Sequence, residues 1–307
     1  INGEEVMGRV RRERDRFVGF VIEGVENIAE KHHIRKHAAF LDNHTLQVGD
    51  SIIEAKTIVI ATGSSPIVMP KFAELGDRLI VNDDIFNWET LPESVAVFGP
   101  GVIGLELGQA LHRLGVRIRL FGRSGSLKPL TDTGIRDYAV KVFQEEFPLD
   151  AKANILGMER KGEQVMIRFV DREDGIEKLE NFDYVLAATG RSPNVKDLGL
   201  ENTSLELDSR GVPIFDPVSM QCGDSSIFIA GDANNVLPLL HEAADEGFIA
   251  GDNAGSFPEI NPGMRRSPLS IVFCDPQIAM VGQAWSELAG QENVVVGKMS
   301  FEAQGRS

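Results

Sequence analysis

The chain has 307 residues but only two cysteines, and it has no long hydrophobic run. Cys222 and Cys274 lie too far apart in the sequence to form a CxxC redox or metal motif, so we expect two buried free thiols. No apolar run approaches the ~18 residues of a membrane-spanning helix. The N-terminus also lacks the basic segment followed by an apolar one that a secretory signal needs. We therefore expect no membrane association and a cytoplasmic location.

Positive charge is also scarce. Lysine and arginine number 31 against 46 aspartates and glutamates, which gives a net charge of −15. Such a chain repels polyanions overall, so no nucleic-acid partner is expected. Residues 4–31 place apolar side chains at helical spacing, which predicts a helix with one buried face and with its arginines in solvent. The apolar stripe is formed by Val6, Val10, Phe17, Val21, Val25 and Ile28.

Short alternating segments predict antiparallel strands in two parts of the chain. Residues 37–41 and 45–48 predict a pair around the turn 42–44, and residues 152–180 predict a meander. Histidines cluster near the first pair, but their spacing fits no zinc pattern, so no metal site is expected. They are His32, His33, His37 and His44.

The clearest motif is a glycine loop between a strand and a helix. The valine-rich run 95–98 predicts a buried strand, and Gly99-Pro100-Gly101-Val102-Ile103-Gly104 follows it directly. In this pattern the first glycine makes a tight turn, the second lets a pyrophosphate approach the backbone, and the third lets the helix pack against the strand. The N–H groups at the helix start, with those of Val102 and Ile103, would bind the pyrophosphate. The helix is expected to bury Ile103, Leu107, Leu111 and Leu114.

The strand predicted at 116–121 completes a βαβ unit, and its end bears on the nicotinamide cofactor. NAD-selective sites usually carry an acid about 20 residues after the glycine loop, where it accepts hydrogen bonds from the adenine ribose. Gly122 occupies this place, and Arg123 follows it. An arginine can hold a 2′-phosphate in a bidentate fork, with Lys128 as a second cation. Although Gly104 is the third glycine typical of NAD sites, the pattern favours NADP(H) over NAD(H).

Three apolar strands are predicted to end in small residues, at 57–64, 183–191 and 226–232. Small residues at the carboxyl end of a buried strand let a flat ligand lie against the backbone, where open α/β sheets bind ligands. Asp232 adds a carboxylate at one of these ends. It either accepts hydrogen bonds from sugar-like hydroxyls or caps its own loop, and the residues alone leave both interpretations open.

Six motifs in a fixed order carry a resemblance to a known family. They are Ala61-Thr62-Gly63, the loop 99–106, the stretch 188–194, Ala230-Gly231-Asp232, Leu239-Leu240-His241 and Ile278-Ala279-Met280-Val281-Gly282. In order and spacing, essentially the whole chain resembles the flavin-dependent pyridine nucleotide-disulfide oxidoreductases, and the dihydrolipoamide dehydrogenase branch most closely.

The resemblance implies a role for each matching residue. Asp232 would bind the ribityl chain of FAD, and the backbone at 239–241 would face the pyrimidine edge of its flavin. Glu106 would be catalytic, since it resembles the glutamate that pairs with a lysine beside the redox disulfide. The implied FAD-binding set is Ala38, Thr62, Gly63, Asp232, Leu239, Leu240 and His241. The NAD(P)-binding set combines Gly99, Gly101, Val102, Ile103, Gly104 and Arg123, predicted above from the loop and the strand end, with Gly190 and Arg191, which the resemblance adds.

The chain departs from the family pattern in several places. Family members carry a first glycine fingerprint for FAD and a Cys-x4-Cys disulfide before the position of Ile1, and a His–Glu pair after that of Ser307. We therefore expect this chain to be the middle of a longer polypeptide. Cys274 stands where the family commonly has threonine. Lys36 stands where glycine is usual, beside the implied adenine contact at Ala38.

The expected fold is α/β, with two interleaved FAD- and NAD(P)-binding Rossmann-like domains, antiparallel meanders, and the start of an α+β dimerisation domain. The expected boundaries are 1–91 and 214–263 for the FAD domain, 92–213 for the NAD(P) domain and 264–307 for the dimerisation segment. The implied activity is hydride transfer between NAD(P)H and FAD and on to a small or protein-bound dithiol or disulfide, in a homodimer. Two alternatives stay open: a transhydrogenase or NADH oxidase relative without a disulfide, and a nucleotide-binding module without turnover.

Overall fold

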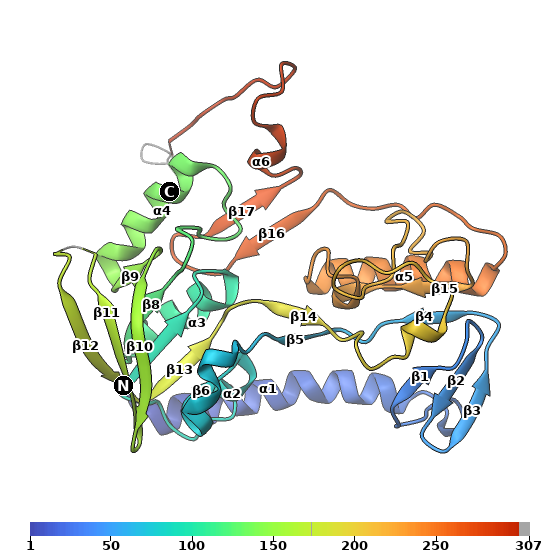
Figure 1. The fold of residues 1–307 in the computed structure, drawn as a ribbon, viewed down its shortest axis with the longest axis horizontal. Helices are drawn as coiled ribbons and strands as arrows, with labels where there is room; N and C mark the ends of the chain where they lie inside the picture. The colour runs from blue at the N-terminus through green and yellow to red at the C-terminus, as the bar shows by residue number, and fades with distance from the viewer. Residues whose placement is uncertain (173, 301–307) are drawn as a thin grey trace.

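The computed structural model describes residues 1–172 and 174–300, which form two lobes joined by extended chain (Figure 1). A parallel sheet organises one lobe. Its five strands run in the order β6-β13-β7-β8-β9, and all four neighbouring pairs are parallel. The strands are β6 (Leu79–Ile80), β7 (Ser94–Phe98), β8 (Arg117–Phe121), β9 (Leu149–Asp150) and β13 (Tyr184–Ala187). Helices α2 (Asn82–Ile85), α3 (Val102–Arg113) and α4 (Thr133–Glu146) connect them.

Every residue of β7 is buried because both faces of this sheet are covered. Val95 and Val97 pack with Leu105 of α3 and Phe143 of α4. Alternate residues of β7 point the other way, into a second core formed with an antiparallel meander. The meander consists of β10 (Asn154–Lys161), β11 (Gln164–Val170) and β12 (Glu177–Phe182).

The other lobe is built around a short parallel pair, β4 (Ile58–Ile60) with β15 (Ile227–Ile229). Helix α5 (Leu240–Ser256) packs against both strands, and 3₁₀ turn η4 (Gly231–Asn234) follows β15. A second meander consists of β1 (Ala38–Phe40), β2 (Thr45–Val48) and β3 (Ser51–Glu54). Strands β5 (Ser64–Pro66) and β14 (Arg191–Pro193) pair antiparallel where the chain crosses between the lobes. The remaining 3₁₀ turns are η1 (Glu30–His32), η2 (Pro70–Arg78) and η3 (Leu200–Asn202).

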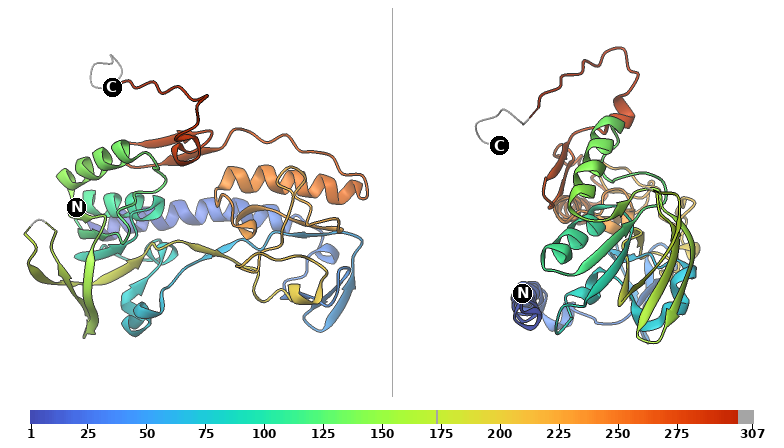
Figure 2. Two further views of the ribbon diagram at one scale, coloured as in Figure 1. Left: turned by 45° about the horizontal axis from the view of Figure 1, so that its top comes forward. Right: turned by 90° about the vertical axis from the view of Figure 1, so that its left-hand side faces the viewer.

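The first helix, α1 (Gly3–Glu26), forms as expected, but it does not bury the expected face. Met7 is its one buried residue, and residues 15–32 are all exposed, including Phe17 and Val21. Figure 2 shows α1 end-on at the periphery of the molecule. The expectation that its arginines lie in solvent is also wrong for two of them. Arg14 Nη1 donates to Phe86 O at 2.7 Å, and Arg11 Nη1 donates to Trp88 O.

The buried face of α3 also differs from the expected stripe. Its buried residues are Gly104, Leu105, Gly108, Gln109 and Leu111, so Leu111 alone is shared with the expectation. The two small glycines let the helix lie close to the sheet, so that Ile103 and Leu107 are only partly buried, and Leu107 packs at the border of the core. A pattern of large apolar residues misses such a contact, because glycine adds no hydrophobic signal.

The C-terminal part forms a hairpin of β16 (Leu269–Val272) and β17 (Ile278–Val281), followed by α6 (Trp285–Leu288). After α6 the chain up to residue 300 forms no further strand within the described residues. Across 1–172 and 174–300, no helix is both long and apolar enough to span a membrane. The α/β class and the pairing of parallel sheet with antiparallel meanders agree with the expected fold, whereas the domain boundaries stay a prediction.

Candidate dinucleotide sites

The glycine loop between β7 and α3 has two structural glycines and one open glycine. Gly99 has a φ of +114°, and an added Cβ would lie 2.8 Å from the Ala188 carbonyl carbon and overlap its oxygen. A Cβ on Gly104 would lie 3.1 Å from the Gly99 carbonyl carbon. Around Gly101, by contrast, no described atom other than those of its chain neighbours lies within 4 Å of an added Cβ. The loop therefore offers free space at the one position where a ligand must approach the backbone.

The start of α3 is an anion site in its geometry. Gly101 is the N-cap residue and supplies no side-chain cap, and the Leu105 N–H makes the first helical bond, to Gly101 O at 2.9 Å. The N–H groups of Val102, Ile103 and Gly104 precede that bond and belong to the unpaired first turn. Together with the helix dipole they favour a negative ligand. The residues present thus fit the diphosphate of a dinucleotide.

The end of β8 explains why an acid is missing there. A Cβ on Gly122 would lie 2.8 Å from the Ala151 carbonyl carbon and 2.8 Å from Pro100 Cγ. Any side chain, an acid included, would force apart the glycine loop and the turn after β9. Arg123 is exposed next to it, and Lys128 is exposed with its N–H bonded to Pro100 O at 3.1 Å. Both predicted cations therefore lie on the segment that borders the loop.

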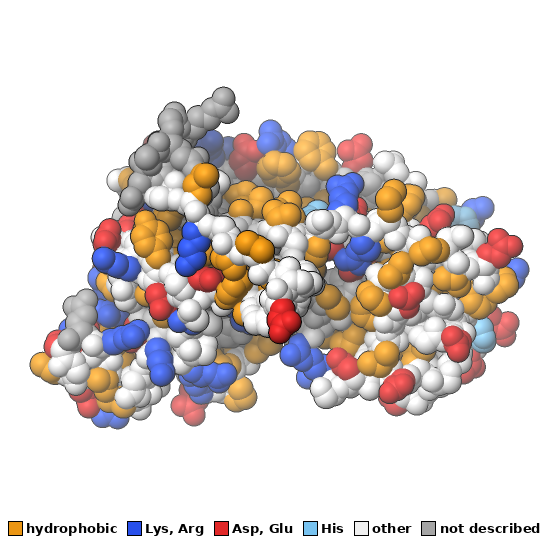
Figure 3. Space-filling view, turned by 90° about the horizontal axis from the view of Figure 1, so that it is seen from above, with side chains coloured by type: hydrophobic (Ala, Val, Ile, Leu, Met, Phe, Trp, Pro, Cys, Tyr) orange, Lys and Arg blue, Asp and Glu red, His pale blue; other side chains and the backbone are white. Residues whose placement is uncertain are grey.

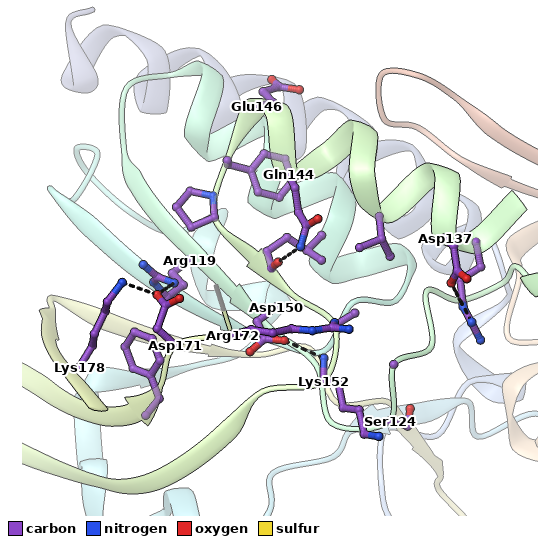
Figure 4. Close-up of a pocket in the computed structure, with 18 residues that line it drawn as sticks. Arg119, Ser124, Asp137, Gln144, Glu146, Asp150, Lys152, Asp171, Arg172 and Lys178 are labelled. Carbon is purple, nitrogen blue, oxygen red and sulfur yellow. Dashed lines mark hydrogen bonds and ion pairs between the residues drawn. The ribbon is translucent and has the colours of Figure 1, made fainter. Parts of the chain in front are cut away.

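A groove of about 920 Å³ lies along the outer edge of the sheet, between α4, β9 and the meander (Figure 4). Ser124 and Lys152 lie on the same side of it, at the ends of the neighbouring strands β8 and β9. Lys178 is held by Asp171, with Nζ 2.7 Å from Oδ2. Lys152 was not predicted from the sequence. The signal was available, because the ends of adjacent parallel strands converge on one edge of a sheet.

A second site lies where β4 and β15 end. Ser64 Oγ donates to Asp232 Oδ2 at 2.6 Å, and Arg191 Nε donates to Ser64 Oγ at 2.7 Å. The Arg191 guanidinium lies 3.8 Å from the Asp232 carboxylate. Of the two interpretations left open for Asp232, this contact points away from loop capping, because the carboxylate accepts from Ser64 across the site. Gly63 and Gly190 directly precede the partners Ser64 and Arg191.

The backbone at this second site is tied to the same crossing chain. Thr62 Oγ1 donates to Asn194 O at 2.7 Å, and the Asn194 N–H donates to Gly63 O at 2.9 Å. An added Cβ on Gly63 would meet no described atom within 4 Å. Small residues and the Asp232 carboxylate fit a flat ring with a hydroxylated chain, as the resemblance implies for FAD.

Helix α5 starts at this site without a side-chain cap, after the N-cap residue Leu239. Leu240 is 88% exposed, and His241 Nε2 lies 3.1 Å from Leu269 O. The N-terminus of α5 thus offers unpaired N–H groups, as the N-terminus of α3 does. Ala38 lies instead in the β1–β3 meander, in register with Val48.

Glu106 makes a contact that the sequence did not predict. Its Oε1 accepts from the Phe273 N–H at 2.8 Å, which ties α3 to the residue after β16. One turn on, Gln109 donates to Asp275 O at 2.7 Å and accepts from the Asp275 N–H at 2.7 Å. Gln109 is buried and was not singled out from the sequence, because nothing local marks a glutamine as a contact between segments.

Both thiols are buried, as expected. Burial raises the pKa of the Cys222 thiol to about 12, and burial likewise raises the pKa of Cys274. Neither cysteine is therefore a ready thiolate at neutral pH. Among residues 1–172 and 174–300, no group of three or more histidine, cysteine, aspartate or glutamate side chains is arranged to hold a metal ion.

A parallel sheet with a glycine loop at a helix start, and small-residue strand ends beside a second uncapped helix, defines the class of dinucleotide-binding α/β proteins. The sequence profile of the pyridine nucleotide-disulphide oxidoreductases matches residues 7–247, and the chain belongs to this family.

Named relatives come from several bacteria. The chain is 27% identical to a dihydrolipoyl dehydrogenase of Buchnera aphidicola, over 97% of this chain and 64% of the relative. It is 32% identical to a dihydrolipoyl dehydrogenase of Chlamydia pneumoniae, over 84% of this chain and 54% of the relative. It is 31% identical to a mercuric reductase of Staphylococcus aureus, over 81% of this chain and 45% of the relative. The chain thus spans about half to two thirds of these relatives' length.

Solved structures show the same fold. The HOCl-induced flavoprotein disulfide reductase RclA from Escherichia coli superposes with a TM-score of 0.77 at 21% identity, over 91% of this chain and 64% of that one. LpdA from Mycobacterium tuberculosis superposes with a TM-score of 0.68 at 26% identity, over 82% of this chain and 56% of that one.

Proposed function

We propose that this chain is the dinucleotide-binding core of an FAD-dependent oxidoreductase. It would pass hydride between NAD(P)H and FAD, and reducing equivalents on to a dithiol or disulfide substrate. The observation that carries the proposal is the presence in one chain of two strand edges that each lie beside a helix start without a side-chain cap. The first has the open Gly101 loop and the bare start of α3. The second has the Asp232 carboxylate and the bare start of α5.

The residues would act by binding and orientation, while a bound flavin supplies the hydride chemistry. The loop 99–104 would hold the nicotinamide dinucleotide by its diphosphate. Asp232 would hold the sugar-like chain of FAD, with Ser64 and Arg191 fixing the direction of its carboxylate. Glu106 would orient a cation near the flavin, through the carboxylate oxygen that does not bind Phe273.

Names of relatives support a thiol or metal-ion acceptor but do not choose between them. Dihydrolipoyl dehydrogenase and mercuric reductase are the names of proteins of which this chain covers only part.

A homodimer is proposed as well. Large apolar side chains are exposed on the hairpin and on α5, where Figure 3 shows hydrophobic groups on the upper face, and a second copy would cover them. A cytoplasmic location belongs to the same proposal.

The test is a titration of the whole polypeptide that carries this chain. Bound FAD should be seen in its visible absorbance, and anaerobic NAD(P)H should bleach it. A flavin that bleaches without any disulfide turnover would favour a transhydrogenase or NADH oxidase instead. A protein that binds nicotinamide dinucleotide but no flavin would be a nucleotide-binding module, and the proposal would fail.

For the nicotinamide cofactor we propose a preference for NADP(H). Gly122 leaves no room for the acid that selects NAD, because its Cβ would meet Ala151 and Pro100. Arg123 is exposed at this edge, and Lys152 adds a cation at the end of the adjacent strand. A 2′-phosphate carries about two negative charges, which two cations can bind.

Titration with both reduced cofactors checks this preference. Arg123→Ala and Lys152→Ala should each lower the affinity for NADPH by about tenfold, which is the effect of one charge-assisted hydrogen bond. The affinity for NADH should stay nearly unchanged. The matched control is Lys161→Ala, an exposed lysine at the end of β10 that pairs with Glu159 at 3.0 Å and does not line the groove, and it should change neither affinity. Tighter binding of NADH by the unchanged protein would contradict the preference.

A further inference from the structure

Helix α5 carries two buried carboxylates that the proposed chemistry does not use. Glu246 is 2% exposed and Glu242 is 5% exposed, one helical turn apart. Arg265, on the segment between α5 and β16, donates Nη1 to Glu246 Oε1 at 2.9 Å and Nη2 to Glu242 Oε2 at 2.6 Å. A buried charge is retained only where it is paired and hydrogen-bonded. These carboxylates satisfy that condition through one shared arginine.

The other oxygen of Glu246 faces the Asp232 loop. Oε2 accepts from the Gly231 N–H at 2.8 Å and from Asn234 Nδ2 at 2.6 Å. Both donors belong to η4, on either side of Asp232. Gly231 adopts a φ of +67°, and a Cβ on it would lie 3.1 Å from Ala243 Cβ of α5. The loop is thus held tightly against the helix by a side chain that lies behind it.

We propose that Glu246 is a positioning residue for flavin binding. It holds η4 from behind, so that the Asp232 carboxylate stays beside Ser64 and Arg191 at the front of the site. Arg265 pairs with Glu246 as well as with Glu242 and thereby links the flavin loop to the segment that enters the β16–β17 hairpin. The inference rests on the proposed flavin site and concerns a residue to which no role was assigned from the sequence.

The three partners of Glu246 are all donors, and this makes the site selective for a carboxylate. Glutamine has the same shape but supplies only one acceptor oxygen and a new NH₂ group. With its oxygen toward Gly231 and Asn234, its NH₂ group would face the Arg265 guanidinium. Glu246→Gln should therefore keep part of the loop geometry, whereas Glu246→Ala removes all three contacts.

The experiment compares variants of the whole polypeptide in two titrations, one with FAD after flavin removal and one with NADPH. Glu246→Ala should lower the affinity for FAD by about ten- to a hundredfold, as expected for the loss of hydrogen bonds to a charged group, and Glu246→Gln should lower it by less. NADPH affinity should stay unchanged in both, because the glycine loop lies in the other lobe. Asp245→Ala is the control: the neighbouring carboxylate pairs with the exposed Arg266 at 3.5 Å and should leave both affinities unchanged.

The outcomes separate this inference from the proposed function. If the unchanged protein binds no FAD, the proposed flavin site is wrong. If the unchanged protein binds FAD, and if both Glu246→Ala and Glu246→Gln bind FAD as tightly as the unchanged protein does, Glu246 does not position the loop. Equal losses of FAD and NADPH affinity would show general destabilisation and would also overturn the inference. Should Glu246→Ala fail to fold, the isosteric Glu246→Gln decides, through its FAD affinity relative to NADPH.

Discussion

Adding a methyl group to either of two glycines in the β7–α3 loop should show which glycine is needed for stability and which for ligand binding. At Gly104 the new Cβ would overlap the Gly99 carbonyl group and lie 3.4 Å from Ala188 Cβ. No side-chain rotation relieves a clash with backbone, so α3 must move away from β7. Overpacking of this kind costs ~1–3 kcal/mol, a large part of the ~5–15 kcal/mol that stabilises a domain. Gly104→Ala should lower the free energy of unfolding by that amount.

Gly101→Ala should behave in the opposite way. Its Cβ would meet no described atom within 4 Å, and its φ of −100° is open to any residue. Alanine restricts the unfolded chain by ~0.4–1 kcal/mol, and this gain is offset by its poorer N-cap preference. Stability should therefore change little. The methyl group would, however, stand where the diphosphate approaches the N–H groups of α3, and the loss of one such bond corresponds to about ten- to a hundredfold in affinity.

Denaturant unfolding and titration with NADPH and NADH measure the two effects on the same samples. Gly101→Ala should be stable and bind poorly, and Gly104→Ala should be unstable. Unchanged cofactor affinity in Gly101→Ala would show that the diphosphate does not lie on this loop. Unchanged stability in Gly104→Ala would show that the close approach of helix and strand is absent.

Three further predictions concern Glu106, the two buried thiols and Glu146. Glu106→Gln keeps an oxygen for the Phe273 N–H, so thermal stability should barely change while flavin reduction in the whole polypeptide slows clearly; small and equal effects would leave Glu106 only a structural role. The 307-residue chain should reduce neither lipoamide nor glutathione, because both thiols are buried, and any measurable turnover would refute this. Arg113 donates to Glu146 and holds the pKa of that carboxyl below its usual value. The stability that this ion pair contributes is therefore complete at a pH above the pKa of Glu146 in the unfolded chain. It is lost as the pH falls through the lower pKa of Glu146 in the folded chain. The stability difference between the unchanged chain and Glu146→Gln should accordingly shrink in acid, and a difference that persists there would contradict the assignment.

Local geometry is what the sequence predicted well. The glycine spacing at 99–104 implies a tight turn, an open position and a close packing contact, and each glycine has the backbone surroundings for its part. The strands ending near Gly63, Gly190 and Asp232 were also visible, because apolar runs that stop at small residues need no tertiary information. For the same reason the α/β class followed directly from the order of elements.

Contacts between distant segments were not predictable in this way. The proposed roles of three residues depend on contacts with other segments or on a neighbouring strand end, which their local sequence does not show. These residues are Gln109, Lys152 and Glu246. The apolar stripe of α1 shows the reverse case. Helical spacing at Phe17 and Val21 predicted burial, yet among the described residues nothing covers that half of the helix. Periodicity specifies which face is apolar, but only the tertiary arrangement determines what lies against it.

Helix α3 joins these two kinds of information. Its first turn, set by local glycine geometry, faces the proposed diphosphate site, while Glu106, Gln109 and Arg113 along its length hold the turn at 273–275. A rigid helix fixed at both places would transmit a shift of the loop to the turn of the β16–β17 hairpin. Substitutions along α3 can therefore alter cofactor binding without touching the cofactor. A kinetic effect at Glu106 argues for a direct role only if Gln109→Ala, which loosens the same contact, does not reproduce it.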